Sequence, residues 1–152
     1  TIKFNTTLAV LDRFIKNLVV NTRKEDEITE DGIEKLHIKT PSSLVNCSTL
    51  SGGNQQKVVI AKWLATDPKI LILDEPTRGI DVGAKAEIYT IINNLAKQGL
   101  AIILISSEMP EVMNMSDRMM IMREGHIMGE LSHDEYDQER ILKYAMGVSN
   151  NE

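Results

Sequence analysis

The sequence predicts an α/β fold with a mainly parallel sheet, an α-helical subdomain before it and a C-terminal β-hairpin. Two short apolar runs without alternation, residues 69–73 and 100–105, are typical of strands covered on both faces of a parallel sheet. The segment between them has helical spacing, so strand, helix and strand form a right-handed βαβ crossover. Two later apolar runs, residues 119–122 and 127–131, flank a turn sequence and indicate the hairpin.

The composition is that of an ordinary globular domain. The chain has 152 residues, of which 42% are hydrophobic and 26% charged, enough to bury a core. A net charge of −5 argues against nucleic acid as a partner of the whole surface. No apolar run approaches the roughly 20 residues that span a bilayer, and we expect no leader sequence. The single cysteine, Cys47, fits a reducing, cytoplasmic compartment.

Residues 1–65 are predicted to be the helical subdomain. Residues 1–21 carry apolar side chains at roughly helical spacing and favour one amphipathic helix. Residues 22–39 are rich in charge and favour a largely solvated helix or helix pair. After a loop that contains Pro41, a further helix is expected from about residue 52 to residue 65. We interpret Trp63 in this last helix as a core or interface residue.

Residues 66–152 are predicted to be the α/β portion. After the strand at residues 69–73, Asp81 is in position to cap a helix that runs to about residue 97, and Gly99 falls where a C-terminal cap belongs. The second strand follows. Pro110 is expected to lie in the first turn of a short helix, and residues 139–145 form the last helix after the hairpin.

Two short motifs could carry chemistry. Asp74 and Glu75 end an apolar strand at its carboxyl edge, where ligands bind in open α/β sheets. One carboxylate there could hold Mg²⁺ and the other could orient or deprotonate a water molecule, although solvent-facing acids at a capped strand end would look the same. Ser51-Gly52-Gly53 at a helix start leaves backbone N–H groups open to an anion, although a serine cap needs no ligand.

The order of these motifs is more specific than either motif alone. LSGGNQQ at residues 50–56, LILDEPT at 71–77 and GID at 79–81 resemble the ATPase subunit of ABC transporters. More narrowly, NQQKVVIAKWLATDPKILILDEPTRGIDVGAKAEIY and ISSEMPEV resemble the second ATPase half of monosaccharide importers of the ribose, galactose and xylose type. The close resemblance covers about residues 50–131. It implies an incomplete P-loop NTPase core of the ABC ATPase kind, with ATP and Mg²⁺ as cofactors.

The resemblance also implies roles for individual residues. Residues 50–56 resemble the family's signature motif, which completes the nucleotide site of the opposite ATPase half in a head-to-tail pair. Residues 70–74 resemble the Walker B strand, and Gly79-Ile80-Asp81 resembles the D-loop. The residues expected to bind nucleotide are Ser51, Gly52, Gly53, Gln55 and Asp81; Asp74 is expected to hold the metal, and Glu75 to be the catalytic glutamate.

Two departures from the family pattern limit what this chain can do. It contains no G-x-x-x-x-G-K-[ST] sequence, so the phosphate-binding loop is absent and the chain alone is expected to be inactive. The family's switch histidine aligns with Ser107, which can donate a hydrogen bond to a γ-phosphate but cannot carry charge. A half-site built from Asp74, Glu75 and Ser107 is therefore expected to bind nucleotide and hydrolyse it poorly.

The leading hypothesis is the energy-coupling ATPase half of a monosaccharide importer on the cytoplasmic face of the cell membrane. Its expected partners are a second ATPase half, membrane-spanning permease subunits bound through the helical subdomain and, indirectly, a sugar-binding protein. Nucleic acid is not among them. One alternative is a soluble ABC ATPase that acts on DNA or ribosomes, which would be expected to carry coiled-coil insertions or basic linkers. The other is a non-catalytic regulatory ABC module.

Overall fold

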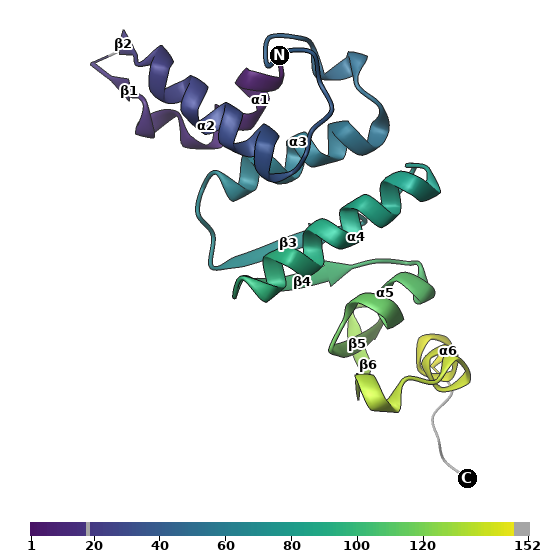
Figure 1. The fold of residues 1–152 in the computed structure, drawn as a ribbon. Helices are drawn as coiled ribbons and strands as arrows, with labels where there is room; N and C mark the ends of the chain where they lie inside the picture. Colours follow the sequence, from purple (N-terminus) through teal and green to yellow (C-terminus); the bar gives the residue numbers. More distant parts are fainter. Residues whose placement is uncertain (18, 148–152) are drawn as a thin grey trace. The chain divides into compact units, whose positions relative to one another are not determined.

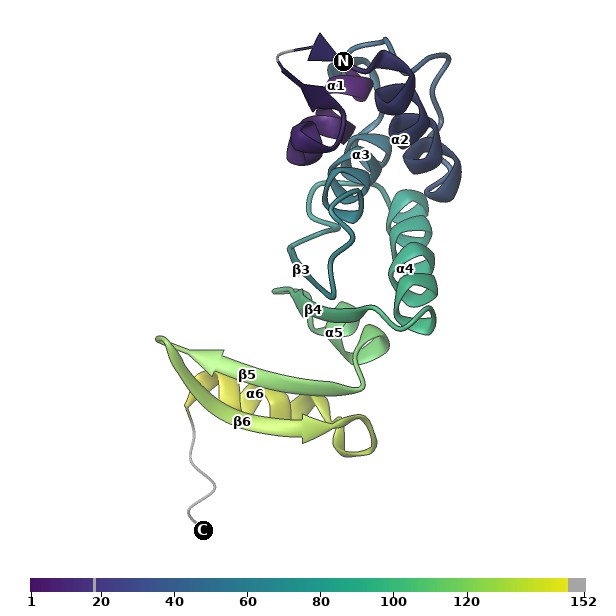
Figure 2. The same cartoon turned by 90° about the vertical axis from the view of Figure 1, so that its left-hand side faces the viewer.

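The computed structural model describes residues 1–17 and 19–147 of the chain (Figures 1 and 2). These residues form two compact units, which divide between Ile103 and Leu104. The predicted boundary between residues 65 and 66 lies inside the first unit and remains a prediction. No helix within the described ranges is long and apolar enough to cross a membrane.

The first half of the first unit is mainly helical. Its elements are α1 (Ile2–Thr7), the 3-10 segment η1 (Leu8–Arg13), the short strands β1 (Ile15–Lys16) and β2 (Val19–Val20), α2 (Thr22–Lys35), the 3-10 turn η2 (Cys47–Thr49) and α3 (Gly52–Leu64). The helix expected at residues 22–39 is thus a single helix, and the one expected at residues 52–65 is confirmed. Most of α2 is solvated, as predicted, with Thr29 as its buried residue.

The prediction of one amphipathic helix over residues 1–21 is wrong. The chain leaves the helical conformation at Val10, which has φ −134° and ψ 30°, and then forms the antiparallel pair β1–β2. Asn17, between the two strands, adopts a left-handed conformation with φ 51°, which asparagine tolerates better than most residues. Ile15, Val19 and Val20 are β-branched and favour the extended backbone, an effect that the apolar spacing concealed.

Gly32 allows three helices to pack closely. A Cβ atom at this position would lie 3.3 Å from both Ala61 Cβ on α3 and Thr6 Cγ2 on α1. Thr6 is fully buried, and Ala61 is 2% exposed. The glycine costs helix stability by its backbone freedom, about 1 kcal/mol relative to alanine, but it permits the contact that holds α2 against its neighbours.

The second half of the first unit leads into the sheet. β3 (Ile70–Asp74) and β4 (Ala101–Ile105) are hydrogen-bonded neighbours, and α4 (Val82–Lys97) connects them. Neighbouring strands joined by a helix run parallel, so β3 and β4 form the parallel pair that the sequence predicts. The helix buries an apolar stripe formed by Ile88, Ile91 and Ile92.

The expectation that the strand at residues 69–73 is covered on both faces is not met in this chain. Leu71 and Leu73 are buried, whereas Ile70 and Ile72 are 58% and 61% exposed. Side chains alternate across a strand, so one face of β3 packs on the described chain and the other is open.

Trp63 also departs from the core interpretation, because it is 49% exposed and the centroid of its ring lies 5.0 Å from Lys62 Nζ.

The second unit begins within β4 and contains the predicted hairpin. After α5 (Met109–Met115), which has Pro110 in its first turn, come β5 (Arg118–Arg123) and β6 (His126–Ser132), paired antiparallel. The turn between the strands is Glu124-Gly125, both with positive φ, which suits a two-residue hairpin loop. The 3-10 turn η3 (His133–Glu135) and α6 (Gln138–Met146) follow. The core of this unit is formed by Met119, Ile121, Leu131 and Ile141.

A long-range contact closes the C-terminal end of α3. Arg13 at the end of η1 donates hydrogen bonds from Nη1 to Ala65 O at 2.6 Å and from Nη2 to Thr66 O at 3.0 Å. A cation at this end of a helix satisfies free carbonyl groups and complements the helix dipole.

We expect Arg13→Ala to lower the free energy of unfolding by about 1 kcal/mol, because two carbonyl groups lose a charged donor at an exposed site. Thermal unfolding followed by circular dichroism measures the change. Arg13→Lys keeps the charge without the two-pronged geometry and should lose only part of the stability. Equal stability of wild type and Arg13→Ala would contradict a stabilising role for this contact.

Candidate functional site

Ser51 occupies the N-cap position of α3 but does not cap the helix with its side chain. Its hydroxyl instead accepts a hydrogen bond from Asn54 Nδ2 at 2.9 Å, and Asn54 Oδ1 accepts one from the Lys39 backbone N–H at 2.8 Å. Gln55 donates from Nε2 to Leu50 O at 2.9 Å. The first turn of α3 therefore has no side-chain cap, and Ser51 and Gly52 are exposed. An uncapped helix start lined by glycine is an arrangement that suits an anion.

Asp74 and Glu75 differ in their backbone conformation. Asp74 is the exposed last residue of β3, whereas Glu75 is partly buried and has a left-handed conformation with φ 47°. For a residue with a side chain, this conformation costs on the order of 1–3 kcal/mol and is common at functional sites. The next residues fix the turn, because Pro76 and Thr77 are buried and the Arg78 N–H donates to Glu75 O at 3.1 Å.

The segment that resembles a D-loop leads directly into α4. Gly79 has φ 75°, a conformation that favours glycine, and Asp81 is the N-cap of the helix. Asp81 Oδ1 accepts a hydrogen bond from the Ala84 N–H at 2.9 Å, so the predicted capping role is confirmed. Its role in nucleotide binding remains a prediction.

The structure brings the signature glycines beside this segment of the same chain. A Cβ atom at Gly52 would lie 3.3 Å from Ile80 Cγ2, and one at Gly53 would lie 2.5 Å from Ala84 Cβ. The start of α3 and the start of α4 are therefore in direct contact. Ser107, two residues after β4, belongs to the second unit and is exposed, so its partnership with Glu75 remains a prediction.

Asp74 suits the metal role that the resemblance assigns to it. Within residues 1–17 and 19–147, no group of three or more His, Cys, Asp or Glu side chains could hold a metal ion. Mg²⁺ in nucleotide sites is usually held by one or two carboxylates, with phosphate and water oxygens completing the octahedron. A single exposed carboxylate at the end of β3 fits this requirement, and the nucleotide would supply further oxygens.

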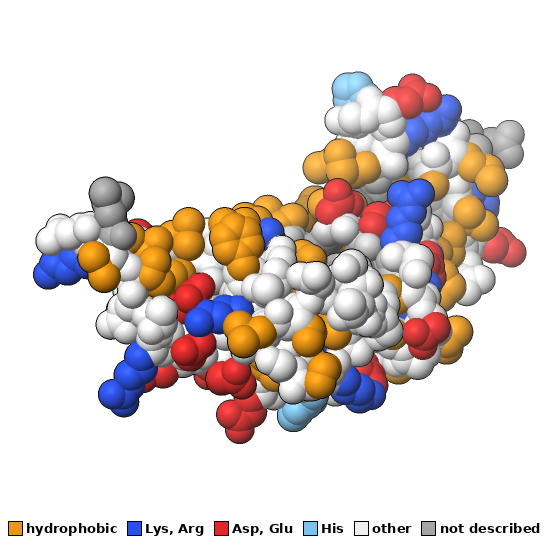
Figure 3. All heavy atoms as spheres, turned by 90° about the horizontal axis from the view of Figure 1, so that it is seen from above, with side chains coloured by type: hydrophobic (Ala, Val, Ile, Leu, Met, Phe, Trp, Pro, Cys, Tyr) orange, Lys and Arg blue, Asp and Glu red, His pale blue; other side chains and the backbone are white. Residues whose placement is uncertain are grey.

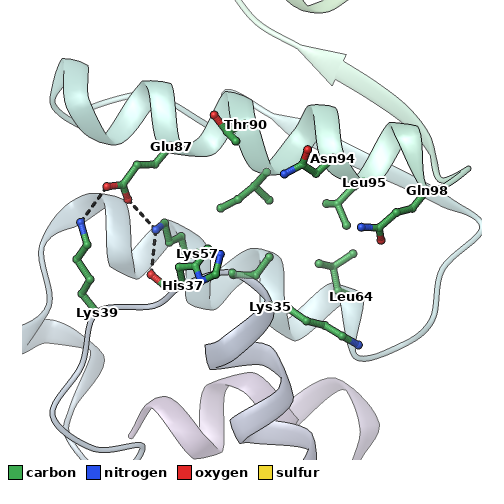
Figure 4. A pocket seen from close by; sticks show the side chains of 12 residues that line it. Lys35, His37, Lys39, Lys57, Leu64, Glu87, Thr90, Asn94, Leu95 and Gln98 are labelled. Carbon is green, nitrogen blue, oxygen red and sulfur yellow. Dashed lines mark hydrogen bonds and ion pairs between the residues drawn. The ribbon is translucent and has the colours of Figure 1, made fainter.

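Sequence reasoning missed an ion-pair cluster that joins α3 to α4 (Figure 4). Lys57 is 3% exposed, and its Nζ donates to Glu87 Oε2 at 2.7 Å and to His37 O at 3.1 Å. Lys39 Nζ donates to the other carboxylate oxygen, Glu87 Oε1, at 2.9 Å. The available signal was that Lys57 stands three and four residues before the apolar Ile60 and Ala61, on the same face of the helix.

The cluster lies at one end of a cleft of about 460 Å³ between the helical subdomain and α4. Leu36, Leu64 and Ile91 contribute apolar surface, whereas Asn94 and Gln98 contribute polar groups. The two lysines hold the pKa of Glu87 well below its usual value of 4.5, at about 2, mainly through their hydrogen bonds to its carboxylate.

Comparison with protein families identifies the class. The family model described as ABC transporter matches residues 3–78, about half of the chain. The chain therefore belongs to the ABC transporter family, the family that the signature and the Asp74–Glu75 motif indicate.

Two relatives illustrate how specific the likeness is. The galactose/methyl galactoside import ATP-binding protein MglA of Clostridium tetani is 53% identical over 146 residues, 95% of this chain and 29% of that protein. The ribose import ATP-binding protein RbsA of Halalkalibacterium halodurans is 52% identical over 147 residues, 97% of this chain and 30% of that protein. The chain thus spans about three tenths of the length of these relatives.

Solved structures confirm the predicted fold class. An ATP-binding cassette of an ABC transporter matches with a TM-score of 0.75 at 23% identity, covering 94% of this chain and 58% of that one. A dimeric cassette in a post-hydrolysis state with ADP and Pi matches with a TM-score of 0.74 at 19% identity, covering 88% and 56%. Both of these chains extend for a further two fifths or so of their own length beyond the matched part.

We predict that Glu87 makes stability depend on acid pH. Because the pKa of Glu87 is about 2 in the folded protein against 4.5 ordinarily, its contribution is fully present above pH 4.5 and is lost as pH falls toward 2. His37, Lys39 and Lys57 line the same cleft as Glu87. The midpoint of thermal unfolding, measured at several pH values, should fall less steeply with acid in Glu87→Gln than in wild type.

Asn94→Ala is the matched control, since it alters the same cleft without removing a carboxylate and should keep the wild-type pH dependence. Parallel curves for wild type and Glu87→Gln would contradict the assignment of the acid sensitivity to this carboxylate.

Proposed function

We propose that this chain is part of the ATP-hydrolysing, energy-coupling component of an ABC importer for monosaccharides. The observation that carries the proposal is the geometry of the two motifs in one unit: an uncapped signature helix start packed against the D-loop, and an acid pair at the end of β3. The sugar class rests on the relatives named as ribose and galactose import proteins.

The residues of β3 would serve this half's own nucleotide. Asp74 would hold Mg²⁺, which neutralises phosphate charge. Glu75 would accept a proton from the water whose oxygen attacks the γ-phosphorus. Its backbone is strained and the residue is partly buried, which favours a side chain held in a fixed place over a freely solvated acid. Ser107 would donate a hydrogen bond to the γ-phosphate, without the charge of a histidine. We infer that this half-site binds ATP and turns it over slowly.

The signature residues would serve a second ATPase half. Ser51 and Gly52 are exposed at a helix start without a side-chain cap, so their hydroxyl and backbone N–H groups are available to a γ-phosphate from outside the chain. Gln55 would hold the start of α3 in place through its hydrogen bond to Leu50 O. Asp81 would contribute to nucleotide binding from the D-loop. The dimeric arrangement named for one of the similar cassettes agrees with a head-to-tail pair.

The helical subdomain offers a surface for the permease subunits. Phe4, Leu8, Leu11, Val19 and Val20 are between 37% and 69% exposed, and Figure 3 shows hydrophobic side chains along the edge of this region. Exposed apolar side chains that lie together can mark an interaction site. The protein would then act as a peripheral component at the cytoplasmic face of the membrane, and a sugar-binding protein would act on it only through the permease.

The direct experiment is ATP hydrolysis by the complete transporter in vesicles, with and without ribose or galactose and their binding protein. We expect Mg²⁺-dependent hydrolysis that a sugar stimulates. Sugar-independent hydrolysis stimulated by nucleic acid or ribosomes would favour the soluble ATPase class instead. Hydrolysis indifferent to this domain's acid pair and signature would favour a regulatory module.

We predict that Ser51→Ala lowers the ATPase rate of the complete transporter more than Glu75→Gln does. Ser51 would complete the competent site of the other half, whereas Glu75 would serve the slow site. Gly53 is a poorer probe, because any side chain there also meets Ala84. Ser48→Ala, an exposed serine three residues upstream, is the matched control and should keep the wild-type rate. Equal losses for Ser51→Ala and Glu75→Gln would remove the asymmetry between the two sites.

A further inference from the structure

The contact between Gly53 and Ala84 leaves no room for a side chain. Gly53 is buried, and a Cβ atom there would lie 2.5 Å from Ala84 Cβ and 3.6 Å from Ala84 Cα. Non-bonded carbon atoms are most stable about 3.5–4.0 Å apart, so an alanine at position 53 would drive α3 and α4 apart by about 1 Å. The obstacle is a methyl group fixed to the helix backbone, which cannot rotate away.

The next contact along the same two helices is ionic. Lys57 lies four residues after Gly53 on α3, and Glu87 lies three residues after Ala84 on α4, so the two contacts stack along the facing helix surfaces. Lys57 Nζ and Glu87 Oε2 are 2.7 Å apart, and Lys39 from the loop before α3 holds the other carboxylate oxygen. Because Lys57 is buried, its ammonium group would be strongly destabilising without Glu87 as its partner, so the two helices must keep the spacing that allows the ion pair.

The residue that meets Gly53 also belongs to the first turn of α4. The Ala84 N–H is held by the Asp81 carboxylate at 2.9 Å, so the end of the D-loop is fixed to the point where the signature helix packs. Gly52 adds a contact to Ile80 in the same segment.

We propose that Gly53, Ala84, Lys57, Glu87 and Lys39 form an α3–α4 clamp, which fixes the signature motif to the D-loop of the same chain, and that Gly53 and Glu87 are positioning residues for ATP hydrolysis. The catalytic part of this inference rests on the proposed function, whereas the packing part does not. In this view the glycine at position 53 is needed for helix packing, in addition to any need for open space at a phosphate.

The clamp makes two nucleotide sites interdependent. The signature faces the nucleotide of the other half, and Asp81 follows the acid pair of this half. Because the N-terminal ends of α3 and α4 are in contact, a displacement of either end displaces the other. A shift of about 1 Å at such groups can cost on the order of 100-fold in rate.

A compensating pair of substitutions tests the clamp in the complete protein. Gly53→Ala adds the methyl group that collides, and Ala84→Gly removes the one it collides with. We expect Gly53→Ala to lower kcat at least about tenfold and to lower the unfolding midpoint, with KM for ATP changed less than about twofold. Ala84→Gly alone should retain most activity, and the double variant should recover both the midpoint and most of the lost kcat. Glu87→Gln should lower kcat with KM unchanged.

The outcomes separate packing from nucleotide contact. Recovery of the midpoint without recovery of kcat would overturn the positioning role and leave Gly53 as a nucleotide contact alone. Absence of any recovery of the midpoint would overturn the clamp. If Gly53→Ala alone fails to fold, a folded and active double variant supports the clamp, and an unfolded one overturns it. A wild-type protein without ATPase activity would overturn the proposed function, while the midpoints would still test the packing.

Discussion

The close approach of α3 and α4 at Gly53 and Ala84 is the constraint on which the candidate site depends. It places the start of the signature helix beside the turn that Asp81 caps, within one compact unit. Helix packing normally keeps axes apart by the width of the side chains at the contact, and only small residues allow less. The pair Gly53–Ala84 supplies that minimum, and the ion pair between the buried Lys57 and the half-exposed Glu87 links the same two helices further along.

Large apolar side chains are exposed in two parts of the first unit. Ile70 and Ile72 on β3, and Phe4 and Val19 in the helical subdomain, are all more than half exposed. Burial of such apolar side chains against another surface would be favourable. The chain thus exposes apolar side chains in two places outside the signature motif.

The elements that the sequence predicted well are those in which local chemistry and packing agree. The α3 and α4 helices combine apolar side chains at helical spacing with caps, and the hairpin at Glu124-Gly125 combines apolar runs with turn residues; the two strands of the sheet form where expected, but neither is covered on both faces. Over residues 1–21 the helical spacing of apolar side chains competes with β-branched residues and Asn17, so the prediction of a single helix is wrong. Trp63 is not a core residue, because residue type predicts average burial whereas its helix face is open; its interpretation as an interface residue stays a prediction.

The sequence by itself determined the class of chemistry. The order of LSGGNQQ, the acids Asp74 and Glu75 and the turn at Asp81 depends on residue types at short range, which a sequence records directly. Only the tertiary structure decided how these parts are joined. The contacts Gly53–Ala84 and Lys57–Glu87 each link positions about thirty residues apart, and both depend on how two helices meet. No local pattern encodes that meeting, because a glycine in a signature motif looks the same whether it admits a phosphate or a neighbouring helix.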